Sequence, residues 1–289
     1  MTKKKKVRKK TGLVSYAFTF PSLFFFGLAL LIPFLMGFNI AFTDWNGVTK
    51  DYNYIGLENF IKIFHDSRLI NPMRNTIIYA LISVIFSNLV TLGLAVLFNS
   101  IKGKTGNIAR LCVFVPCCLS GVLSAFIWKF LYRFVLSAMT GLDSPLGSTF
   151  WVLPAVMVIA LWNGAGINML IYFAALKNVP QDLYEAALID GATKWQRFKS
   201  VTIPMIMPAF TICITLTFTN GLKEFGTVMS ATGGGPARAS ETISMYIYNN
   251  LYSYSKAGYG QAISLVFLLF LVIAGNLLTN FFRKREVEM

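Results

Sequence analysis

The sequence predicts an all-α, polytopic membrane protein with six transmembrane helices, and three observations support this fold class. Hydrophobic residues make up 55% of the 289 residues and charged residues only 13%, whereas a soluble domain has roughly 25% charged residues. The apolar residues form continuous runs that reach the roughly 20 residues a helix needs to cross a bilayer. Lys and Arg gather between these runs, as in membrane proteins, so the net charge of +14 does not indicate a nucleic-acid partner.

Six stretches are apolar and long enough to be spans. In chain order they are 18–42, 77–98, 111–130, 151–176, 201–229 and 260–282. They are continuous and do not alternate over about ten residues as membrane strands do. The first exceeds the apolar length of a secretory signal and no small-residue cleavage site follows it, so we expect it to remain as a span. Pro116, Pro204 and Pro208 lie within these runs and are expected to kink their helices.

The basic clusters predict the orientation of the chain. They occupy the N-terminal tail, the second and fourth connections and the C-terminal tail, at Lys3, Lys4, Lys5, Lys6, Arg8, Lys9, Lys10, Lys102, Lys104, Arg110, Lys177, Lys194, Arg197, Lys199, Arg283, Lys284 and Arg285. Six spans place all of these segments on one side, which the positive-inside rule makes cytoplasmic. We therefore expect a multi-pass protein of the plasma or inner membrane with both termini in the cytoplasm. Its parts are a basic tail at 1–17, a membrane domain at 18–282 with a cytoplasmic loop at 177–204, and a tail at 283–289.

Residue types that carry catalysis or bind metals are scarce and scattered. The cysteines lie inside apolar runs without a CxxC pair, and the single histidine, His65, lies in a segment predicted to be external. The sequence contains no GxxxxGK[ST] phosphate-binding loop. We therefore expect no catalytic residues, no metal and no cofactor bound by this chain, and no enzymatic activity of its own.

The predicted cytoplasmic loop 177–204 begins with a short helix. Asp182 and Glu185 have the spacing of a capping box, which marks a helix start. Gly191 is expected to end this helix, because Gly suits the left-handed conformation that follows many helix C-termini. The loop is therefore expected to be folded rather than flexible.

A second short helix is expected at 192–200, after the turn at Gly191. Trp195, Phe198 and Val201 recur there at helical spacing. Two short helices joined by a sharp turn would form a knob at the inner face of the membrane. Such a knob has the shape to fit a groove on a partner protein.

This loop resembles the EAA motif of the permease subunits of ABC importers. The motif residues are Glu185, Ala186, Ala187, Asp190, Gly191, Ala192, Phe198 and Pro204. Val201 and Ile203 complete the match. In that family the motif forms the coupling helix that docks on a cytoplasmic ATPase, so the resemblance implies a type I ABC importer permease fold and an ATPase-coupling role for these residues. Glu185 is expected to meet a basic group of the ATPase.

Nearly the whole chain resembles a carbohydrate permease of the maltose-transporter type, nearest to the first of its two permease subunits. Outside the loop, the resemblance rests on Trp162–Gly166, Asn168, Thr232–Pro236, Tyr246, Tyr248 and Gly258–Gly260. Some first subunits carry extra N-terminal spans and a large external domain. This sequence has neither, and it is similar to the shorter, six-span oligosaccharide versions.

The resemblance implies a permease subunit that translocates a sugar, a di- or oligosaccharide, by alternating access. The implied partners are a second homologous permease subunit in a heterodimer, two cytoplasmic ATPase subunits that use ATP-Mg, and an extracellular or periplasmic solute-binding protein. An ABC permease for another small solute, such as a polyamine or phosphate, is the alternative. An ion-coupled secondary transporter is a further alternative, although it does not explain a folded EAA loop.

Polar and aromatic residues inside the spans are candidates for the sugar path, because polar groups at that depth are costly and transport sites lie near the bilayer midplane. They are Trp162, Asn163, Asn168 and Tyr172 on the fourth span, and Asn220, Lys223, Glu224 and Phe225 on the outer half of the fifth. Bonding between helices and anchoring at the membrane interface are the alternative roles for these side chains. Asn88 in the second span is expected to hydrogen-bond a neighbouring helix.

Overall fold

The computed structural model describes residues 13–101 and 103–286, and this part of the chain consists of helices and turns. The α-helices of the described residues are α1 (Leu13–Phe26), α2 (Ile32–Ile40), α3 (Glu58–His65), α4 (Ser67–Ser100), α5 (Gly103–Phe114), α6 (Gly121–Phe130), α7 (Ser137–Thr140), α8 (Val152–Lys177), α9 (Gln181–Ile189), α10 (Lys194–Arg197), α11 (Ile203–Met205), α12 (Met207–Leu222), α13 (Gly226–Ala231), α14 (Ile243–Tyr248) and α15 (Ala257–Arg283). One isolated β-bridge joins Thr43 and Tyr54. The prediction of an all-α protein is confirmed.

Five helical stretches of the described residues are long and apolar enough to cross a membrane. They are Phe18–Ile40, Ser67–Ser100, Gly121–Thr140, Val152–Lys177 and Ala257–Arg283. The helices Lys194–Met205 and Met207–Leu222 together form a sixth candidate, bent by 69° at the break between them. Pro208 follows this break at the start of α12, where it has no intrahelical N–H bond to lose.

The helix bounds differ from the predicted stretches at several places. The second span begins at Ser67 rather than at 77, and the third candidate span is Gly121–Thr140 rather than 111–130. The tail predicted at 1–17 ends in helix, since α1 begins at Leu13, and the Lys cluster Lys3–Lys10 lies outside the described residues. The stretch 111–130 holds two helices, because a tight turn containing Pro116 ends α5 and Ser120 caps α6. The stretch 201–229 is likewise divided, with α12 ending at Leu222.

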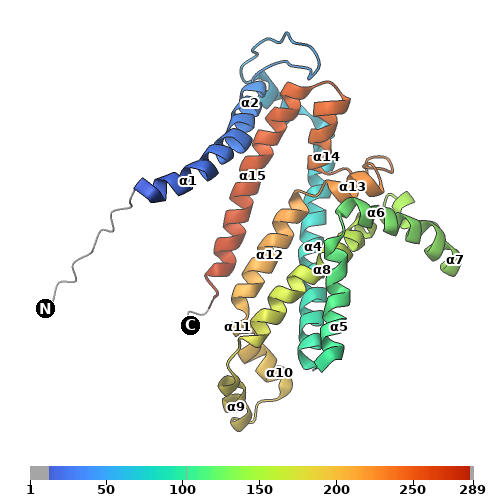
Figure 1. The fold of residues 1–289 in the computed structure, drawn as a ribbon. Coiled ribbons are helices and arrows are strands. Elements are labelled where there is room, and N and C mark those ends of the chain that lie inside the picture. The colour runs from blue at the N-terminus through green and yellow to red at the C-terminus, as the bar shows by residue number, and fades with distance from the viewer. Residues whose placement is uncertain (1–12, 102, 287–289) are drawn as a thin grey trace.

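The helices α4, α8 and α12 form the centre of the bundle, and α15 packs along α12 (Figure 1). Small residues let these helices approach closely, as is common in membranes. A Cβ added at Gly221 of α12 would lie 2.9 Å from the Cα of Ala80 on α4. A Cβ added at Gly166 of α8 would lie 2.7 Å from the Cα of Phe114 at the end of α5. Glycine at both positions therefore sets the spacing of the bundle.

The molecule has two distinct ends (Figure 1). At the lower end, residues 181–205 project beyond the bundle as a bent pair of helices, and we call this segment the elbow. At the upper end lie the loop between α2 and α3, the helix α14 and the start of α15. The first span, Phe18–Ile40, leans away from the bundle, and none of its most apolar window is buried within the chain.

Candidate functional site

The first arm of the elbow is α9, which begins directly after Pro180. Pro180 holds the N-cap position and no side chain caps the helix, so the predicted capping box of Asp182 and Glu185 is wrong. The helix starts at Gln181, two residues earlier than a box with Asp182 as N-cap requires, and Asp182 stands inside its first turn. There its negative charge still favours the helix N-terminus. Glu185 is exposed and remains available to a partner.

The turn of the elbow lies at Gly191, whose φ of +74° confirms the predicted left-handed conformation. The N–H of Ala192 donates to the carbonyl of Ala187 at 2.9 Å, and the N–H of Gly191 donates to the carbonyl of Leu188 at 3.0 Å. This pair of bonds is a Schellman motif, which satisfies the last carbonyls of a helix. These backbone hydrogen bonds therefore define the angle between the arms. They require a residue at position 191 that can adopt a positive φ without strain, as Gly does.

The second arm begins with a capping box that the sequence interpretation missed. The Thr193 hydroxyl accepts from the N–H of Gln196 at 3.3 Å, and the Gln196 side chain accepts from the N–H of Thr193 at 2.7 Å. The T-x-x-Q pattern is the signal that would have revealed it. The arm is not the separate short helix predicted at 192–200, because helix continues from Lys194 to Met205 and leads into the fifth span.

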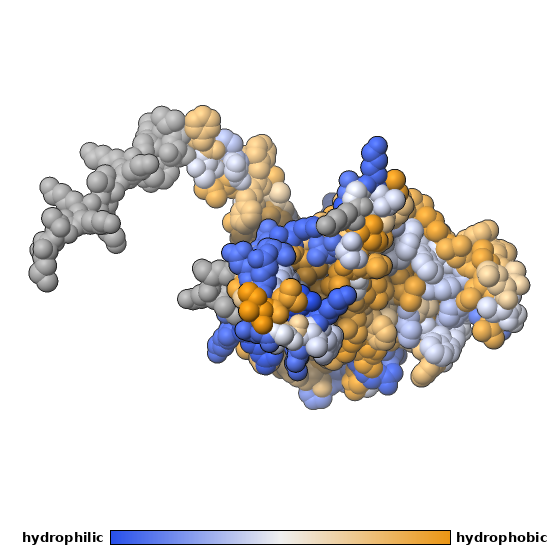
Figure 2. Space-filling view, turned by 90° about the horizontal axis from the view of Figure 1, so that it is seen from below, coloured by the Kyte–Doolittle hydropathy of each residue, from blue (hydrophilic) through white to orange (hydrophobic). Residues whose placement is uncertain are grey.

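The elbow presents an apolar surface surrounded by polar residues. Ile189 is 87% exposed, Leu188 59% and Trp195 69%, and Trp195 stacks on Phe198 with ring centroids 5.8 Å apart. Figure 2, which looks onto this end, shows a hydrophobic patch among hydrophilic residues. A hydrogen bond of 2.9 Å between the hydroxyls of Tyr184 and Thr202 joins the two arms. The elbow thus holds its two arms together by hydrogen bonds and presents apolar side chains that no residue in 13–101 or 103–286 covers.

The predicted coupling residues differ in how far they reach the surface. Glu185, Ala186, Asp190 and Gly191 are exposed, whereas Ala187, Ala192, Phe198 and Pro204 are half-buried. The exposed group lies on the first arm and at its turn. The half-buried group lies where the arms meet or where the second arm approaches the bundle.

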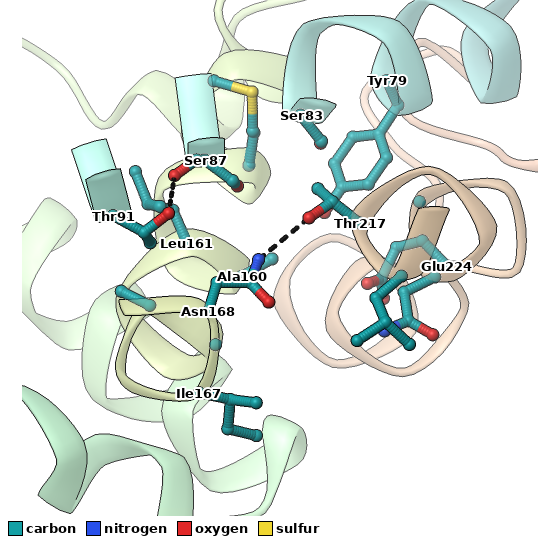
Figure 3. A pocket seen from close by; sticks show the side chains of 16 residues that line it. Tyr79, Ser83, Ser87, Thr91, Ala160, Leu161, Ile167, Asn168, Thr217 and Glu224 are labelled. Atoms are coloured by element: carbon teal, nitrogen blue, oxygen red, sulfur yellow. Dashed lines mark hydrogen bonds between the residues drawn. The ribbon is translucent and has the colours of Figure 1, made fainter. Parts of the chain in front are cut away.

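A central cavity of about 170 Å³ lies between α4, α8 and α12. Its polar lining consists of Tyr79, Ser83, Ser87 and Thr91 from α4, Asn168 from α8, Thr217 and Asn220 from α12, and Glu224 just beyond α12. Figure 3 shows these side chains around the space, with Asn168 donating to the Thr217 hydroxyl at 2.9 Å. Glu224 is the only charged side chain among the described residues that line the cavity.

Three of the eight predicted path residues, Asn168, Asn220 and Glu224, line this cavity. The others serve packing or lie elsewhere. Tyr172 is fully buried and donates to Asn88 at 2.7 Å, so Asn88 bonds a neighbouring helix as predicted. Such interhelical bonds contribute about 0.6 kcal/mol on average.

Two further path candidates hold the broken third span in place. Asn163 donates to the carbonyls of Pro116 and Leu119, at 2.9 and 3.1 Å, and to the Ser124 hydroxyl at 2.9 Å. The Pro116 carbonyl also accepts from the N–H of Leu119 at 3.1 Å within the turn that ends α5, so Asn163 ties this turn to α8. Trp162 packs edge-on against Trp128, with ring centroids 6.0 Å apart.

The remaining two candidates lie in the turn after α12. Lys223 lines a separate groove between α2 and α15, and Phe225 packs on Tyr248 with ring centroids 5.1 Å apart. The sequence placed both on the fifth span, but that helix ends at Leu222.

The sequence interpretation missed the polar stripe on α4. Tyr79, Ser83, Ser87 and Thr91 recur every four residues, which places them on one face of a helix. The hydroxyl of Ser83 is buried and has no hydrogen-bond partner among the described residues. Small hydroxyl residues in membrane helices commonly bond their own helix, as Thr91 does to the carbonyl of Ser87, so their presence alone is a weak signal. Their four-residue spacing was the available signal.

At the end opposite the elbow, Asp66 joins three segments. Its carboxylate accepts hydrogen bonds from the hydroxyls of Tyr246 at 2.6 Å and Tyr259 at 2.7 Å, and from the N–H of Arg68 at 3.0 Å. Burial raises the pKa of Asp66, but these hydrogen bonds and the Arg68 charge outweigh it and leave the pKa below its usual value. Burial, together with the hydrogen bond to Asp66, raises the pKa of Tyr246 to about 12.

A bundle of candidate membrane helices around a polar cavity, with an ordered elbow at one end, defines a membrane transport component. The chain belongs to the family described as the binding-protein-dependent transport system inner membrane component, whose model matches residues 87–286. This membership confirms the resemblance drawn from the EAA loop and makes the protein a multi-pass membrane permease component.

Several relatives are similar over nearly their whole length. The chain is 33% identical to the protein named "Probable starch degradation products transport system permease protein AmyD" of Thermoanaerobacterium thermosulfurigenes, over 97% of each chain. It is 28% identical to the lactose transport system permease protein LacF of Rhizobium radiobacter, covering 99% of this chain and 98% of the relative. It is 30% identical to the osmoprotective compounds uptake permease protein GgtC of a Synechocystis strain, covering 93% and 98%.

A solved structure shares the fold. A chain of a bacterial ABC transporter involved in the import of the acidic polysaccharide alginate matches with a TM-score of 0.81 at 22% identity, covering 94% of this chain and 95% of that chain. The predicted type I ABC importer permease fold is therefore confirmed.

Proposed function

We propose that this chain is one transmembrane subunit of an ATP-binding-cassette importer that translocates a di- or oligosaccharide by alternating access. Separate ATPase subunits, which use ATP-Mg, drive the cycle. This chain supplies no catalytic residue and binds no cofactor. It forms part of the path through the membrane and links the ATPase subunits to that path.

The elbow is the observation that carries this proposal. Its apolar surface at Leu188, Ile189 and Trp195 is uncovered, while its internal bonds keep it ordered. A rigid, exposed apolar knob fits a groove on a partner, in the manner of a helix-in-groove contact. Glu185 stands exposed beside it to meet a basic group of the ATPase. The coupling role of Glu185, Ala186, Ala187, Asp190, Gly191, Ala192, Phe198 and Pro204 is part of this proposal.

The proposed orientation places the elbow in the cytoplasm together with both termini. The described cations on the elbow side, among them Lys177, Lys194 and Lys199, support it by the positive-inside rule. The opposite end then faces outward, toward a solute-binding protein.

The proposed complex holds a second, homologous permease subunit and two ATPase subunits. A cavity of about 170 Å³ is smaller than the roughly 300–1,000 Å³ of typical ligand sites. A second subunit facing this cavity would complete the enclosure of an oligosaccharide. The first span, which buries little within this chain, also leaves apolar surface for lipid or for that subunit.

The sugar as cargo is supported by the cavity and by the names of the relatives. Hydroxyl and amide groups on α4, α8 and α12 suit sugar hydroxyls, and the cavity contains no Lys or Arg among its described lining residues. Relatives are named for starch degradation products and for lactose. The alternative is another small solute, which a relative named for osmoprotective compounds supports. A cationic solute would be favoured by Glu224.

Reconstitution tests the proposed function. The chain is co-purified with candidate permease, ATPase and binding-protein partners and placed in liposomes. We expect the binding protein loaded with an oligosaccharide to stimulate ATP hydrolysis and to drive uptake that ionophores do not abolish. Loading with spermidine or phosphate instead of saccharides tests the alternatives. Failure to co-purify with an ATPase, or uptake that follows an ion gradient, would reject the proposal.

A further inference from the structure

A second pocket, of about 740 Å³, opens at the end of the molecule opposite the elbow. It lies where α3 and the start of α4 meet the segment before α14, α14 itself and the start of α15. Four cationic side chains line it: Lys62, Arg68, Arg238 and Lys256. We call it the basic pocket. Segments more than 150 positions apart in the chain supply these cations, so they meet only in the folded protein.

The floor of the basic pocket is fixed by the Asp66 hydrogen bonds to Tyr246 and Tyr259, both of which are buried. Two cations lie over these rings. The Nζ of Lys62 is 5.7 Å from the Tyr259 ring centroid, and the guanidinium of Arg238 is 5.6 Å from that of Tyr246. A site whose walls are already ordered loses less conformational entropy when a partner binds.

The charges of the basic pocket are unbalanced. Arg238 pairs with Glu241, and this is the single salt bridge found among residues 13–101 and 103–286. Asp66 is the one carboxylate among the described residues that line the pocket, and its oxygens already accept hydrogen bonds from two tyrosines and a backbone N–H. Lys62, Arg68 and Lys256 are exposed and make no salt bridge in this part of the chain. The pocket therefore carries surplus positive charge toward the solvent.

We propose that the basic pocket receives an acidic loop of the solute-binding protein. This inference rests on the proposed function, which makes this end external and the binding protein its partner. A volume of about 740 Å³ exceeds what one carboxylate needs and admits several side chains of a protruding loop. Complementary charge at such a contact speeds association and selects the partner.

The position of the basic pocket connects docking to the transport path. Asp66, on its floor, caps the N-terminus of α4 by accepting from the N–H of Arg68. The same helix carries the polar stripe that lines the central cavity. A loop seated in the basic pocket therefore contacts the outer end of a helix whose middle forms the path.

The test uses the complete transporter in nanodiscs and the binding protein that stimulates ATP hydrolysis by the wild type. In the variant Lys62→Glu/Lys256→Glu, we expect the Kd for the binding protein to rise about tenfold at low salt, mainly through slower association. We also expect the Kd of this variant to depend less on salt than the wild-type Kd. Lys62→Arg/Lys256→Arg keeps both charges and should retain the wild-type Kd.

A matched control carries the same charge change outside the basic pocket. Lys50 lies in the loop between α2 and α3 and lines a different depression, so Lys50→Glu should leave the Kd unchanged. Size-exclusion chromatography checks that every variant still assembles with its partners. A Kd in Lys62→Glu/Lys256→Glu that equals the wild-type value, with the same salt dependence, overturns the docking inference.

Two further outcomes are distinguishable. If inorganic phosphate binds the wild type and is lost in Lys62→Glu/Lys256→Glu while the binding-protein Kd stays constant, the basic pocket is a small-anion site and the docking inference fails. If no binding protein stimulates the wild type, the proposed function itself fails and the docking inference falls with it.

Discussion

The elbow and the central cavity are built by opposite means. The elbow is made by one continuous segment, residues 181–205, and its shape depends on bonds between residues close in sequence, such as Thr193 with Gln196. The cavity is made by three helices, and residues as far apart as Tyr79 and Glu224 line it. A surface formed by local bonds can move as a unit on a partner. A cavity formed between helices changes shape whenever those helices shift.

The largest effect is expected at the turn of the elbow. In Gly191→Val, a β-branched residue must adopt a φ of +74°, at a cost of about 1–2 kcal/mol or more. We expect the Schellman turn to open and the uptake stimulated by binding protein to fall at least about tenfold, since 1.4 kcal/mol is a factor of about ten. Uptake and ATP hydrolysis in liposomes measure it.

Gly191→Asn is the matched control, because Asn tolerates the left-handed conformation. It should retain most of the uptake. Wild-type uptake in Gly191→Val would show that transport does not depend on the angle between the two arms of the elbow.

The second effect concerns the helices around the cavity. In Gly221→Ala the new Cβ would lie 2.9 Å from the Cα of Ala80, so α12 must move away from α4. Overpacking of this kind costs about 1–3 kcal/mol. We expect a lower thermal midpoint of the purified complex. Gly93→Ala on α4 is the control, since a Cβ there meets no atom within 4 Å. Equal midpoints for the two variants would contradict the close approach.

The third prediction concerns the charged side chain that lines the central cavity. Glu224→Gln removes the charge from the cavity and keeps an oxygen that can accept from the N–H of Thr227, now 2.8 Å from the carboxylate. For a neutral saccharide, we expect uptake to fall by no more than about fivefold, the difference between a charged and a neutral acceptor. Loss of uptake well beyond that range, measured with the same panel of solutes, would favour a cationic cargo.

The smallest effect is expected at Asp66. Because its pKa in the folded protein is lowered, the ionised carboxylate stabilises the fold above the unfolded value near 3.8, and this contribution is lost as pH falls through the lower folded pKa. At neutral pH, Asp66→Asn should lower the thermal midpoint by about 2–4 °C. Midpoints measured at decreasing pH should converge below pH 3.8. A difference that stays constant with pH would assign the effect to lost packing.

The elbow was largely accessible to sequence reasoning because its signals are local. Gly191 was predicted to adopt a left-handed conformation and does so. The start of α9 was misplaced because the spacing of Asp182 and Glu185 indicated Asp182 as the N-cap, whereas Pro180 occupies that position. The second arm and the fifth span were predicted as separate helices meeting at 200 and 201, whereas one helix runs from Lys194 to Met205 and the break comes after it.

The cavity was accessible only in part, because hydrophobicity locates a membrane helix but does not say which face meets a neighbour. Asn163 and Tyr172 are polar residues within a span, yet they complete the packing of a broken span and of a buried core. Ser83 and Ser87 were passed over although they face the cavity. Only the contact of α4 with α8 and α12 distinguishes these roles.

The continuous helix from Lys194 to Met205 has a consequence for how motion travels. Twelve residues of helix form a rod about 18 Å long, and the chain bends by 69° where this rod meets α12. Ile206, the residue at the bend, is fully buried, so we expect a displacement of the Lys194 end of this rod to rotate the chain about Ile206. For a given displacement of the Lys194 end, a longer rod would rotate the base of the fifth span through a smaller angle.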